Sequence, residues 1–308
     1  MTVRVPLPTD PELQADLAVV FVTHDTREEV LGALDAVAAD PDRPADLEVV
    51  VVDAGSSDAT VAAVRARDDG TRVLALTNTG FGRGANAGVR ATRAASVLVA
   101  NADVRVRPGA LARLAATLSA EPTVAAVGPQ VRYPGGELQA SARRDLDAAT
   151  IVGHALLGRW WPENRWTHRY HARDLPSELP RDVAWLSGCA LLVRREAFEA
   201  VGGFDPGFFL YVEDVDLGSR LRGAGWRLRY EPAAVVEHRV GASTSRSRWR
   251  ALWHHAHSLD RHLAGRLHGA ARLLRPLLPV GLSVWVVLTA LAERRRWPGS
   301  VTGERLGR

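Results

Sequence analysis

The sequence predicts an α/β protein built on a mostly parallel sheet. Short runs rich in apolar and β-branched residues, typical of buried strands, lie at 17–22, 47–52, 73–76 and 94–99. Segments with helical patterns separate them, and strands that alternate with helices form parallel sheets covered on both faces. With 308 residues, 46% hydrophobic and 24% charged, the chain is excluded from the disordered, collagen-like and coiled-coil classes.

The charge of the chain is unevenly distributed. Residues 1–238 hold 26 arginines and 32 acidic residues, whereas residues 239–308 hold 13 and 3, so balances of −6 and +10 give the net +4. A basic segment of this kind suits an anionic membrane surface or nucleic acid. Within it, the 17 uncharged residues 276–292 are compatible with a helix lying on a membrane, a packed core helix or a true span.

The N-terminus and the cysteine content bear on the compartment. Residues 1–16 are polar and proline-rich, which predicts no cleaved signal peptide and therefore a cytoplasmic chain. The single cysteine, Cys189, excludes an internal disulfide and a cysteine-rich zinc site.

Acidic residues directly follow the ends of the predicted strands. Asp25, Asp53 and Asp103 all stand there, and in parallel sheets ligands bind beyond the carboxyl ends of the strands. Asp25 and Asp58 also suit helix caps. Asp53 is less easily explained as a cap, because Asp58 or Ser56 can cap the helix that follows it.

A glycine-rich loop covers residues 78–88. Its four glycines permit positive φ and a close approach of the backbone to a ligand. The Gly-Lys-Ser/Thr ending of a phosphate loop is missing, and Ala85 stands where a dinucleotide fingerprint needs its third glycine. The loop by itself therefore identifies no ligand.

A second acidic cluster follows an aromatic segment. Glu213, Asp214 and Asp216 fall within four residues, where like charges raise the proton affinity of one of them unless a cation compensates. Such a cluster suits a general base or a metal site, and its alternative is a solvated helix start. His238 ends a further apolar run, as a functional or a structural histidine.

Seven short motifs occur in a fixed order along the chain. They are Asp53-x-Gly-Ser-x-Asp58, Asn78-x-Gly-Phe-Gly-x-Gly-x-Asn86, Asn101-x-Asp103, Trp185-x-Ser-Gly, Gly202-Gly-Phe-Asp205, Glu213-Asp-x-Asp216 and Val236-x-His238. Together they resemble the inverting, GT-A type glycosyltransferases of family 2, most closely the bacterial rhamnosyltransferase branch. The resemblance covers residues 17–245.

This resemblance implies a Rossmann-like GT-A domain at 17–245. Its nucleotide-sugar half would be 17–105, and its acceptor half 106–245 would contain an insertion near 140–182. An extension at 1–16 would precede the domain. A basic and apolar helical region at 246–308 would follow it and associate with the membrane.

The resemblance also implies a nucleotide diphosphate sugar as donor, dTDP-rhamnose in the rhamnosyltransferase branch. Asp53 would accept a hydrogen bond from a base N–H, and His24 would stack on the base. The implied nucleotide-sugar residues are Thr23, His24, Asp53, Gly80, Gly84, Asn86, Asn101 and Asp103.

A divalent cation, Mg²⁺ or Mn²⁺, is the implied cofactor, with Asp103 and His238 as its ligands. Asn101 stands where the family's motif usually has a first carboxylate. One carboxylate can suffice, because diphosphate oxygens and waters supply other ligands to a hard cation.

On the acceptor side, the resemblance gives Asp214 the role of general base in a single displacement with inversion. Trp185, Ser187, Gly188 and Glu213 would bind the acceptor, and Asp216 would be a helix-start residue or would support the site from behind its contacting residues. Ala54 and Ala102 depart from the usual Asn and Pro, which affects loop geometry more than chemistry.

The segment 140–182 matches none of these motifs. Its tryptophans, histidines and arginines suit an irregular packed insertion or an acceptor-binding, membrane-facing segment. A lipid-linked or polysaccharide acceptor at the inner membrane face would account for it and for the basic tail.

Other functions remain open from the sequence. A UDP-hexose or UDP-galactofuranose donor is the first alternative. An NAD-dependent oxidoreductase lacks its fingerprint after the first strand. A non-catalytic nucleotide-binding module is a further alternative, and we expect no nucleic-acid partner because the basic tail has no recognisable reading helix.

Overall fold

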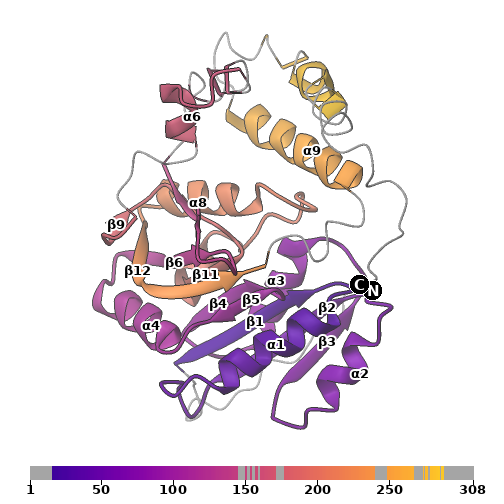
Figure 1. Cartoon of the computed structure of the whole chain (residues 1–308), viewed down its shortest axis with the longest axis vertical. Helices are drawn as coiled ribbons and strands as arrows, with labels where there is room; N and C mark the ends of the chain where they lie inside the picture. Colours follow the sequence, from indigo (N-terminus) through magenta and orange to yellow (C-terminus); the bar gives the residue numbers. More distant parts are fainter. Residues whose placement is uncertain are drawn as a thin grey trace. The chain divides into compact units, whose positions relative to one another are not determined.

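The computed structural model describes residues 16–144, 150, 153–154, 157–158, 160–170, 177–239, 248–266, 273, 275–276, 278–284 and 286–287. Nearly all of the expected extension at 1–16, and parts of the insertion and of the tail, therefore lie outside the described residues. The chain divides into two compact units, Met1–Phe209 with Glu213–Ser243, and Leu210–Val212 with Thr244–Arg308. Figure 1 shows the chain with many of its elements labelled.

The first unit is built on a ten-stranded sheet in which β7 and β9 pair beside the main path β3-β2-β1-β4-β11-β6-β12-β5. A separate two-stranded sheet pairs β8 with β10. The strands are β1 Leu17–Thr23, β2 Glu48–Ala54, β3 Arg72–Leu76, β4 Ser96–Asn101, β5 Val104–Val106, β6 Val124–Arg132, β7 Leu138–Gln139, β8 Ala142–Arg143, β9 Arg181–Asp182, β10 Trp185–Leu186, β11 Ala190–Arg194 and β12 Arg227–His238.

This sheet is mixed rather than mostly parallel. The four strands β3, β2, β1 and β4 are parallel, as are β6 and β12, but β11 runs antiparallel to both β4 and β6. The chain leaves β6 at the carboxyl edge and re-enters at the same edge, since Ala190 of β11 pairs with Ala100 near the end of β4. A strand entered from that edge must run against its neighbours.

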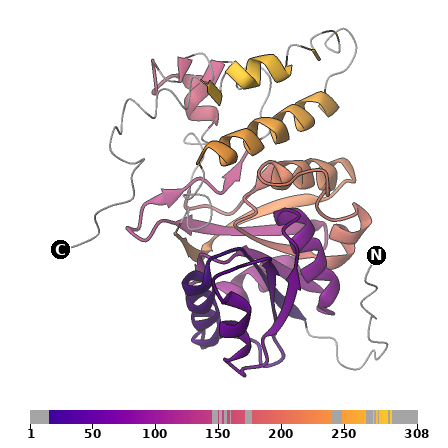
Figure 2. The ribbon, with the colours of Figure 1, turned by 90° about the vertical axis from the view of Figure 1, so that its right-hand side faces the viewer.

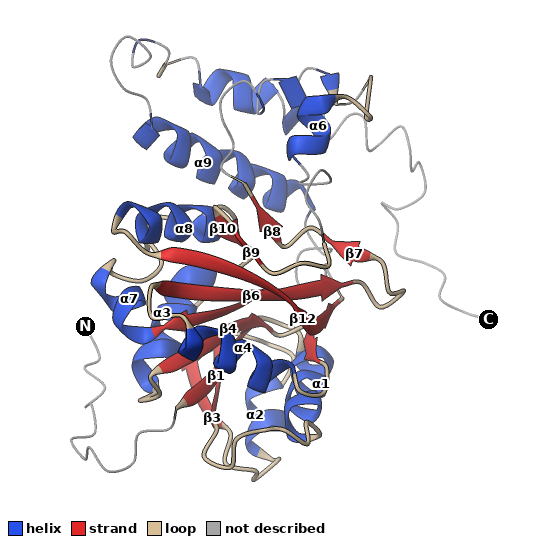
Figure 3. Ribbon diagram, turned by 90° about the vertical axis from the view of Figure 1, so that its left-hand side faces the viewer, coloured by secondary structure: helices blue, strands red, loops and turns tan. Residues whose placement is uncertain are grey.

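Helices cover both faces of the sheet (Figures 2 and 3). Alternate residues of β1 explain this, because Val19 and Phe21 belong to one buried cluster and Ala18 and Val20 to the other. The first cluster includes residues of α1, α2 and α4, and the second includes residues of α3, α7 and α8. The described helices of this unit are α1 Arg27–Ala38, α2 Thr60–Arg65, α3 Phe81–Ala91, α4 Ala110–Ala120, α6 Arg165–Tyr170, α7 Arg195–Ala200 and α8 Glu213–Gly223, and α9 Arg248–Arg266 belongs to the second unit.

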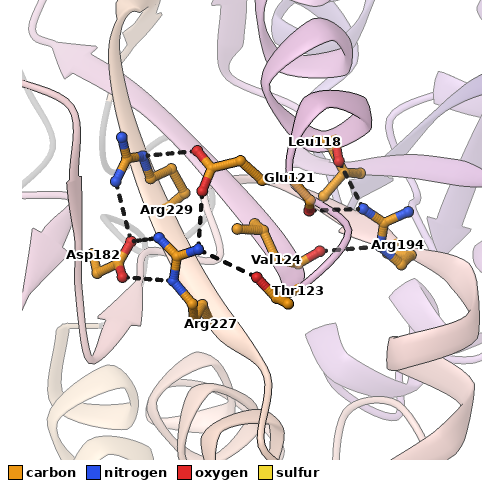
Figure 4. A network of polar contacts seen from close by, with 8 residues as sticks. All are labelled: Leu118, Glu121, Thr123, Val124, Asp182, Arg194, Arg227 and Arg229. Carbon is orange, nitrogen blue, oxygen red and sulfur yellow. Dashed lines mark hydrogen bonds and ion pairs between the residues drawn. The ribbon is translucent and has the colours of Figure 1, made fainter.

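A network of ion pairs joins α4, β9 and β12 (Figure 4). Arg227 contacts Asp182 at 2.7 Å and Glu121 at 3.0 Å, and Arg229 contacts the same two carboxylates at 3.2 and 3.4 Å. Arg194 of β11 donates to carbonyls at the C-terminal end of α4, which the helix itself leaves unpaired. Because Arg227 and Arg229 of β12 both contact Asp182 of β9, these ion pairs attach the end of the insertion to the main sheet.

The second unit contains α9 and the described part of the tail. Among the helices that the structure describes, none is long and apolar enough to cross a membrane. Of the apolar stretch 276–292, residues 277, 285 and 288–292 lie outside the described residues.

Candidate active site

The glycine-rich loop brings α3 close to its neighbours. Gly80 has φ +102°, and a Cβ there would lie 2.3 Å from the carbonyl oxygen of Phe209. At Gly88 a Cβ would lie 2.2 Å from a methyl group of Val20, and at Gly84 it would meet Val22 at 3.1 Å. The helical glycines therefore allow α3 to lie directly on β1 and β2.

Asn86 links α3 to the segment that leads toward α8. Its amide nitrogen donates to the carbonyl of Phe204 at 2.8 Å, and its amide oxygen accepts from the N–H of Phe204 at 2.9 Å. Gly84 and Asn86, which the resemblance assigned to the nucleotide pocket, thus have contacts inside the fold.

The ends of β1 and β2 lie side by side and carry the predicted base-binding residues. Thr23 pairs in register with Asp53, and its hydroxyl bonds to that of Thr26 at 2.7 Å. One carboxylate oxygen of Asp53 accepts from the N–H of Ser56 at 3.0 Å. The other oxygen is buried without a partner among the described residues, as is Nδ1 of His24. A buried acceptor left unpaired is costly, so this edge suits a ligand that donates N–H groups.

Asp25 and Asp58 tie the loops at this edge together. The carboxylate of Asp25 accepts from the N–H of Ser57 at 2.6 Å, and mainly this bond lowers the pKa of Asp25. Asp58 accepts from the N–H groups of Arg27, at the start of α1, and of Thr60 in α2. Asp25 therefore does not cap α1, whose N-cap position is held by Thr26; Asp25 reaches across to the loop after β2, while Asp58 accepts from the first N–H of both helices.

Asp103 and His238 form a close pair near the carboxyl end of β4. His238 pairs in register with Val104, which places its Nε2 3.2 Å from Oδ1 of Asp103. Asn101 Nδ2 lies 3.3 Å from the same nitrogen, and Gln139 fixes the ring through its Nδ1 at 2.9 Å. Both members of the pair are buried.

The proton shared by this pair is held tightly. Burial lowers the pKa of His238, but hydrogen bonds to Asp103 and Cys189 outweigh burial and raise it to about 10. A bound cation would take the place of that proton. Within the described residues no group of three or more His, Cys, Asp or Glu side chains could hold a metal. Asp103 and His238 could supply two ligands to a cation, whose other ligands would then be oxygens of a bound ligand and waters.

One face of α8 is fixed against the strand segment 184–188. Asp214, Gly218 and Arg222 stand four residues apart and therefore share a helix face. Asp214 accepts from the N–H of Gly188 at 2.9 Å, and Arg222 donates to the carbonyl of Ala184 at 3.0 Å. Between them, a Cβ at Gly218 would lie 2.9 Å from that of Trp185. Asp214 is thereby positioned one helical turn from Trp185.

Glu213 and Asp214 begin α8 as a pair with raised proton affinity. Burial, and then the charge of Asp214, raise the pKa of Glu213 to about 8. Burial also raises the pKa of Asp214, although the N–H of Gly188 and the charge of Arg143 act in the opposite direction. One oxygen of Glu213 is buried with no partner in the described part of the chain. Asp216 instead pairs with Arg220 at 2.7 Å, as a helix-start residue.

Two adjacent residues connect the carboxylate pair of α8 with the pair at β4. The N–H of Gly188 binds Asp214, and the carbonyl of Cys189 accepts from the N–H of Asn101 at 2.9 Å. Ser187 shapes this turn, since its N–H donates to the carbonyl of Ser141 and its hydroxyl accepts from the N–H of Cys189. The candidate base and the candidate cation ligands therefore converge on one region.

Sequence reasoning missed two residues here. Gln139 orients His238, and Arg143 stacks against Trp185 with its guanidinium carbon 5.1 Å from the ring centroid. Gln139 borders the segment 140–182 that matched no motif, and Arg143 lies within it. All 39 residues counted as lysine or arginine are arginine, so nothing in the sequence distinguishes Arg143 from the other arginines.

The fold and the site define an α/β protein whose acidic and histidine side chains gather where its strands end. Residues 15–255 match the family described as glycosyltransferase like family 2. The chain therefore belongs to this family and is a glycosyltransferase.

Two relatives place it near rhamnosyltransferases. The chain is 40% identical over 266 residues to the N-acetylglucosaminyl-diphospho-decaprenol L-rhamnosyltransferase of Mycobacterium tuberculosis (strain H37Rv), with 82% of this chain and 85% of the relative covered. It is 42% identical over 82 residues to rhamnosyltransferase WbbL of Escherichia coli (strain K12), and this match covers 27% of this chain and 31% of the relative. The predicted resemblance to that branch is confirmed.

Solved structures confirm the GT-A type of fold. The mannosyltransferase PcManGT from Pyrobaculum calidifontis, in complex with GDP-Man and Mn²⁺, matches with a TM-score of 0.59 at 22% identity, over 97% of this chain and 80% of that one. GalNAc-T7 with UDP, GalNAc and Mn²⁺ matches with a TM-score of 0.57 at 15% identity, over 94% and 59%.

Proposed function

We propose that the protein transfers L-rhamnose from dTDP-rhamnose to a lipid-linked acceptor in cell-envelope glycan synthesis. The mycobacterial relative supports this proposal, since it is similar along most of both chains and its name specifies a sugar on a diphospho-decaprenol as acceptor. The observation that carries the mechanism is the convergence of Asp214 with Asp103 and His238 through Gly188 and Cys189.

On the donor side, we assign the base to the edge formed by Thr23, His24 and Asp53. The unpaired oxygen of Asp53 would accept an N–H of the base. Asp103 and His238 would hold the divalent cation, Mg²⁺ or Mn²⁺, and the two solved structures described above are complexes with Mn²⁺. Such a cation neutralises a leaving diphosphate as a Lewis acid. This assignment makes 17–105 the nucleotide-sugar half of the domain.

On the acceptor side, Asp214 would take the proton from the attacking hydroxyl. Its two oxygens accept from the N–H groups of Gly188 and Val215, which fixes the carboxylate before the acceptor arrives. Its raised pKa favours proton uptake. Glu213, holding its proton near neutral pH, would donate to an acceptor oxygen while Trp185 packs against the sugar. The acceptor half would then be 106–245.

We further propose that the basic C-terminal region holds the enzyme at the inner face of the cell membrane. In α9, Trp249 and Trp253 are each 53% exposed and one turn apart, and they line a shallow pocket with Arg250 and His254. Tryptophan and arginine on one helix suit an interface with anionic lipids. Replacing both tryptophans by serine should reduce cosedimentation with phosphatidylglycerol vesicles, and unchanged cosedimentation would contradict this role.

A donor panel tests the specificity. Thermal shifts with dTDP-rhamnose, UDP-glucose and UDP-galactofuranose, each with Mg²⁺ or Mn²⁺, should show the largest stabilisation with dTDP-rhamnose. A larger shift with either UDP-sugar would replace the donor assignment. The Asp103→Ala variant should lose the metal dependence of this shift, whereas a parent protein that binds the donor equally well in EDTA would refute the cation assignment.

The base is tested by Asp214→Asn with Asp216→Asn as its matched control. We expect Asp214→Asn to lose transfer by at least about a hundredfold while its affinity for the donor stays near that of the parent. The control changes a carboxylate that pairs with Arg220 and should retain transfer. Wild-type turnover in Asp214→Asn would show that another group takes the proton.

A further inference from the structure

Four side chains form a stack beside the candidate base, and we call it the arginine column. The rings of His154 and Tyr170 are stacked with centroids 4.0 Å apart and planes at 13°. The guanidinium carbon of Arg143 then lies 5.9 Å from the centroid of Tyr170 and 5.1 Å from that of Trp185. Three members of the column, Arg143, His154 and Tyr170, belong to the segment 140–182 that matched no motif.

The charge at the centre of this column has no ion-pair partner among the described residues, although the charge of Asp214 acts on it from beyond ion-pairing distance. Among the described residues Arg143 has no carboxylate within ion-pairing distance, and its one hydrogen bond, to the carbonyl of Tyr170, is long at 3.4 Å. By contrast, Arg220 and Arg222 of the adjacent helix are bonded at 2.7 and 3.0 Å. A guanidinium stays protonated, so burial without a partner is costly in the absence of a ligand.

Two N–H donors of the column are also unsatisfied. Nε of Arg143 and Nε1 of Trp185 are both buried without an acceptor in the described structure. The two residues stand directly opposite each other in the β8–β10 pair, so their side chains share one face of that small sheet. Two orphaned donors around an unpaired positive charge select a ligand with several anionic oxygens, such as a phosphate.

The position of the column relative to Asp214 indicates whose phosphate this is. Trp185 packs on Gly218, one helical turn from Asp214, and the charge of Arg143 acts on Asp214. The attacking hydroxyl of the acceptor must reach Asp214. In an acceptor whose sugar is attached to a diphosphate, the first phosphate lies about one sugar ring from that hydroxyl.

We propose that Arg143 and Trp185 bind the diphosphate of the acceptor, with Nε of Arg143 and Nε1 of Trp185 donating to its oxygens. This proposal rests on the proposed transferase function and adds the group that the enzyme recognises in its acceptor. Tyr170 and His154 hold the guanidinium in place through stacking, as positioning residues.

The test compares two acceptors that differ only in the diphosphate, N-acetylglucosaminyl-diphospho-farnesol and the neutral farnesyl N-acetylglucosaminide. With dTDP-rhamnose as donor, Arg143→Ala should raise the KM of the diphosphate acceptor by about tenfold to a hundredfold. The KM values of the neutral acceptor and of the donor should change by less than about twofold, because neither meets Arg143. Arg144→Ala removes the neighbouring exposed arginine and should leave all three KM values near those of the parent.

Each other outcome has a defined meaning. A raised KM for the donor would assign Arg143 to the donor's diphosphate, and equal losses with both acceptors would indicate a structural role; either result overturns the proposal. Should Arg143→Ala fail to fold, Arg143→Lys repeats the comparison, since lysine keeps the charge but loses Nε and the planar stack. Titration of both acceptors without donor gives the same comparison if turnover is absent. A parent protein that binds both acceptors but transfers nothing refutes the proposed function alone.

Discussion

Glu213 makes the stability of the protein depend on pH in a direction opposite to that of a salt-bridged carboxylate. Its pKa is raised from 4.5 to about 8, first by burial and then by Asp214. The folded state therefore holds this proton more tightly than the unfolded chain does. Stability is highest when Glu213 is neutral in both states and falls as the pH rises from about 4.5 to about 8.

The size of this effect follows from the two pKa values. Between about pH 5.5 and about pH 8.5, linkage predicts a loss of about 3 kcal/mol in the free energy of unfolding from Glu213 alone. Glu213→Gln keeps the shape of the side chain and cannot ionise. Relative to the parent, we expect the variant to become more stable as the pH rises across this range, by about that amount.

Urea unfolding at both pH values measures the difference directly. Glu196→Gln is the matched control, because it makes the same chemical change on an exposed residue in the first turn of α7. Apart from the replaced glutamate, each variant keeps the titrating groups of the parent, so the difference between the curves reports Glu213 together with its interaction with Asp214. A Glu213→Gln protein whose stability follows the parent at both pH values would show that Glu213 ionises normally.

Three further predictions concern the framework of the site. Gly88→Ala should lower the free energy of unfolding by about 1–3 kcal/mol, since its Cβ would collide with two valines of the sheet. The control Gly223→Ala has open space around it and should lower the free energy of unfolding by less than about 0.5 kcal/mol. Equal urea midpoints for the two variants would refute the packing argument. Asn86→Ala should cost about 1–3 kcal/mol by leaving both main-chain groups of Phe204 unpaired, and unfolding indistinguishable from the parent would contradict this. Asp58→Ala should cost about 1–2 kcal/mol because two helix starts lose their acceptor, an expectation that calorimetry would overturn by finding an unchanged melting temperature.

The strands of the first hundred residues could be predicted because each carries its signal locally. The four predicted runs agree with β1 to β4 to within two residues at each end. The order of the motifs also identified the family. The direction of β11 could not be predicted in this way, because it depends on where the chain re-enters the sheet and not on the residues of the strand.

The site shows the same division between local and long-range information. Asp103, Asp214 and His238 stood out by residue type and position, while their convergence depends on main-chain bonds of Gly188 and Cys189. Bonds between main-chain groups do not depend on which side chains are present, so the sequence does not reveal them. Arg143 became visible only when β8 and β10 paired and placed it opposite Trp185.

The peptide units of Gly188 and Cys189 have a consequence for how this enzyme can vary. The spacing between Asp214, the proposed general base, and the strand end at Asn101 is maintained by an amide hydrogen and a carbonyl oxygen, which nearly every amino acid provides. The main-chain bond at 189 itself would survive substitution there, although the side chain of Cys189 also contacts His238. Proline at 188 is the exception, because it alone removes the amide hydrogen on which that spacing depends.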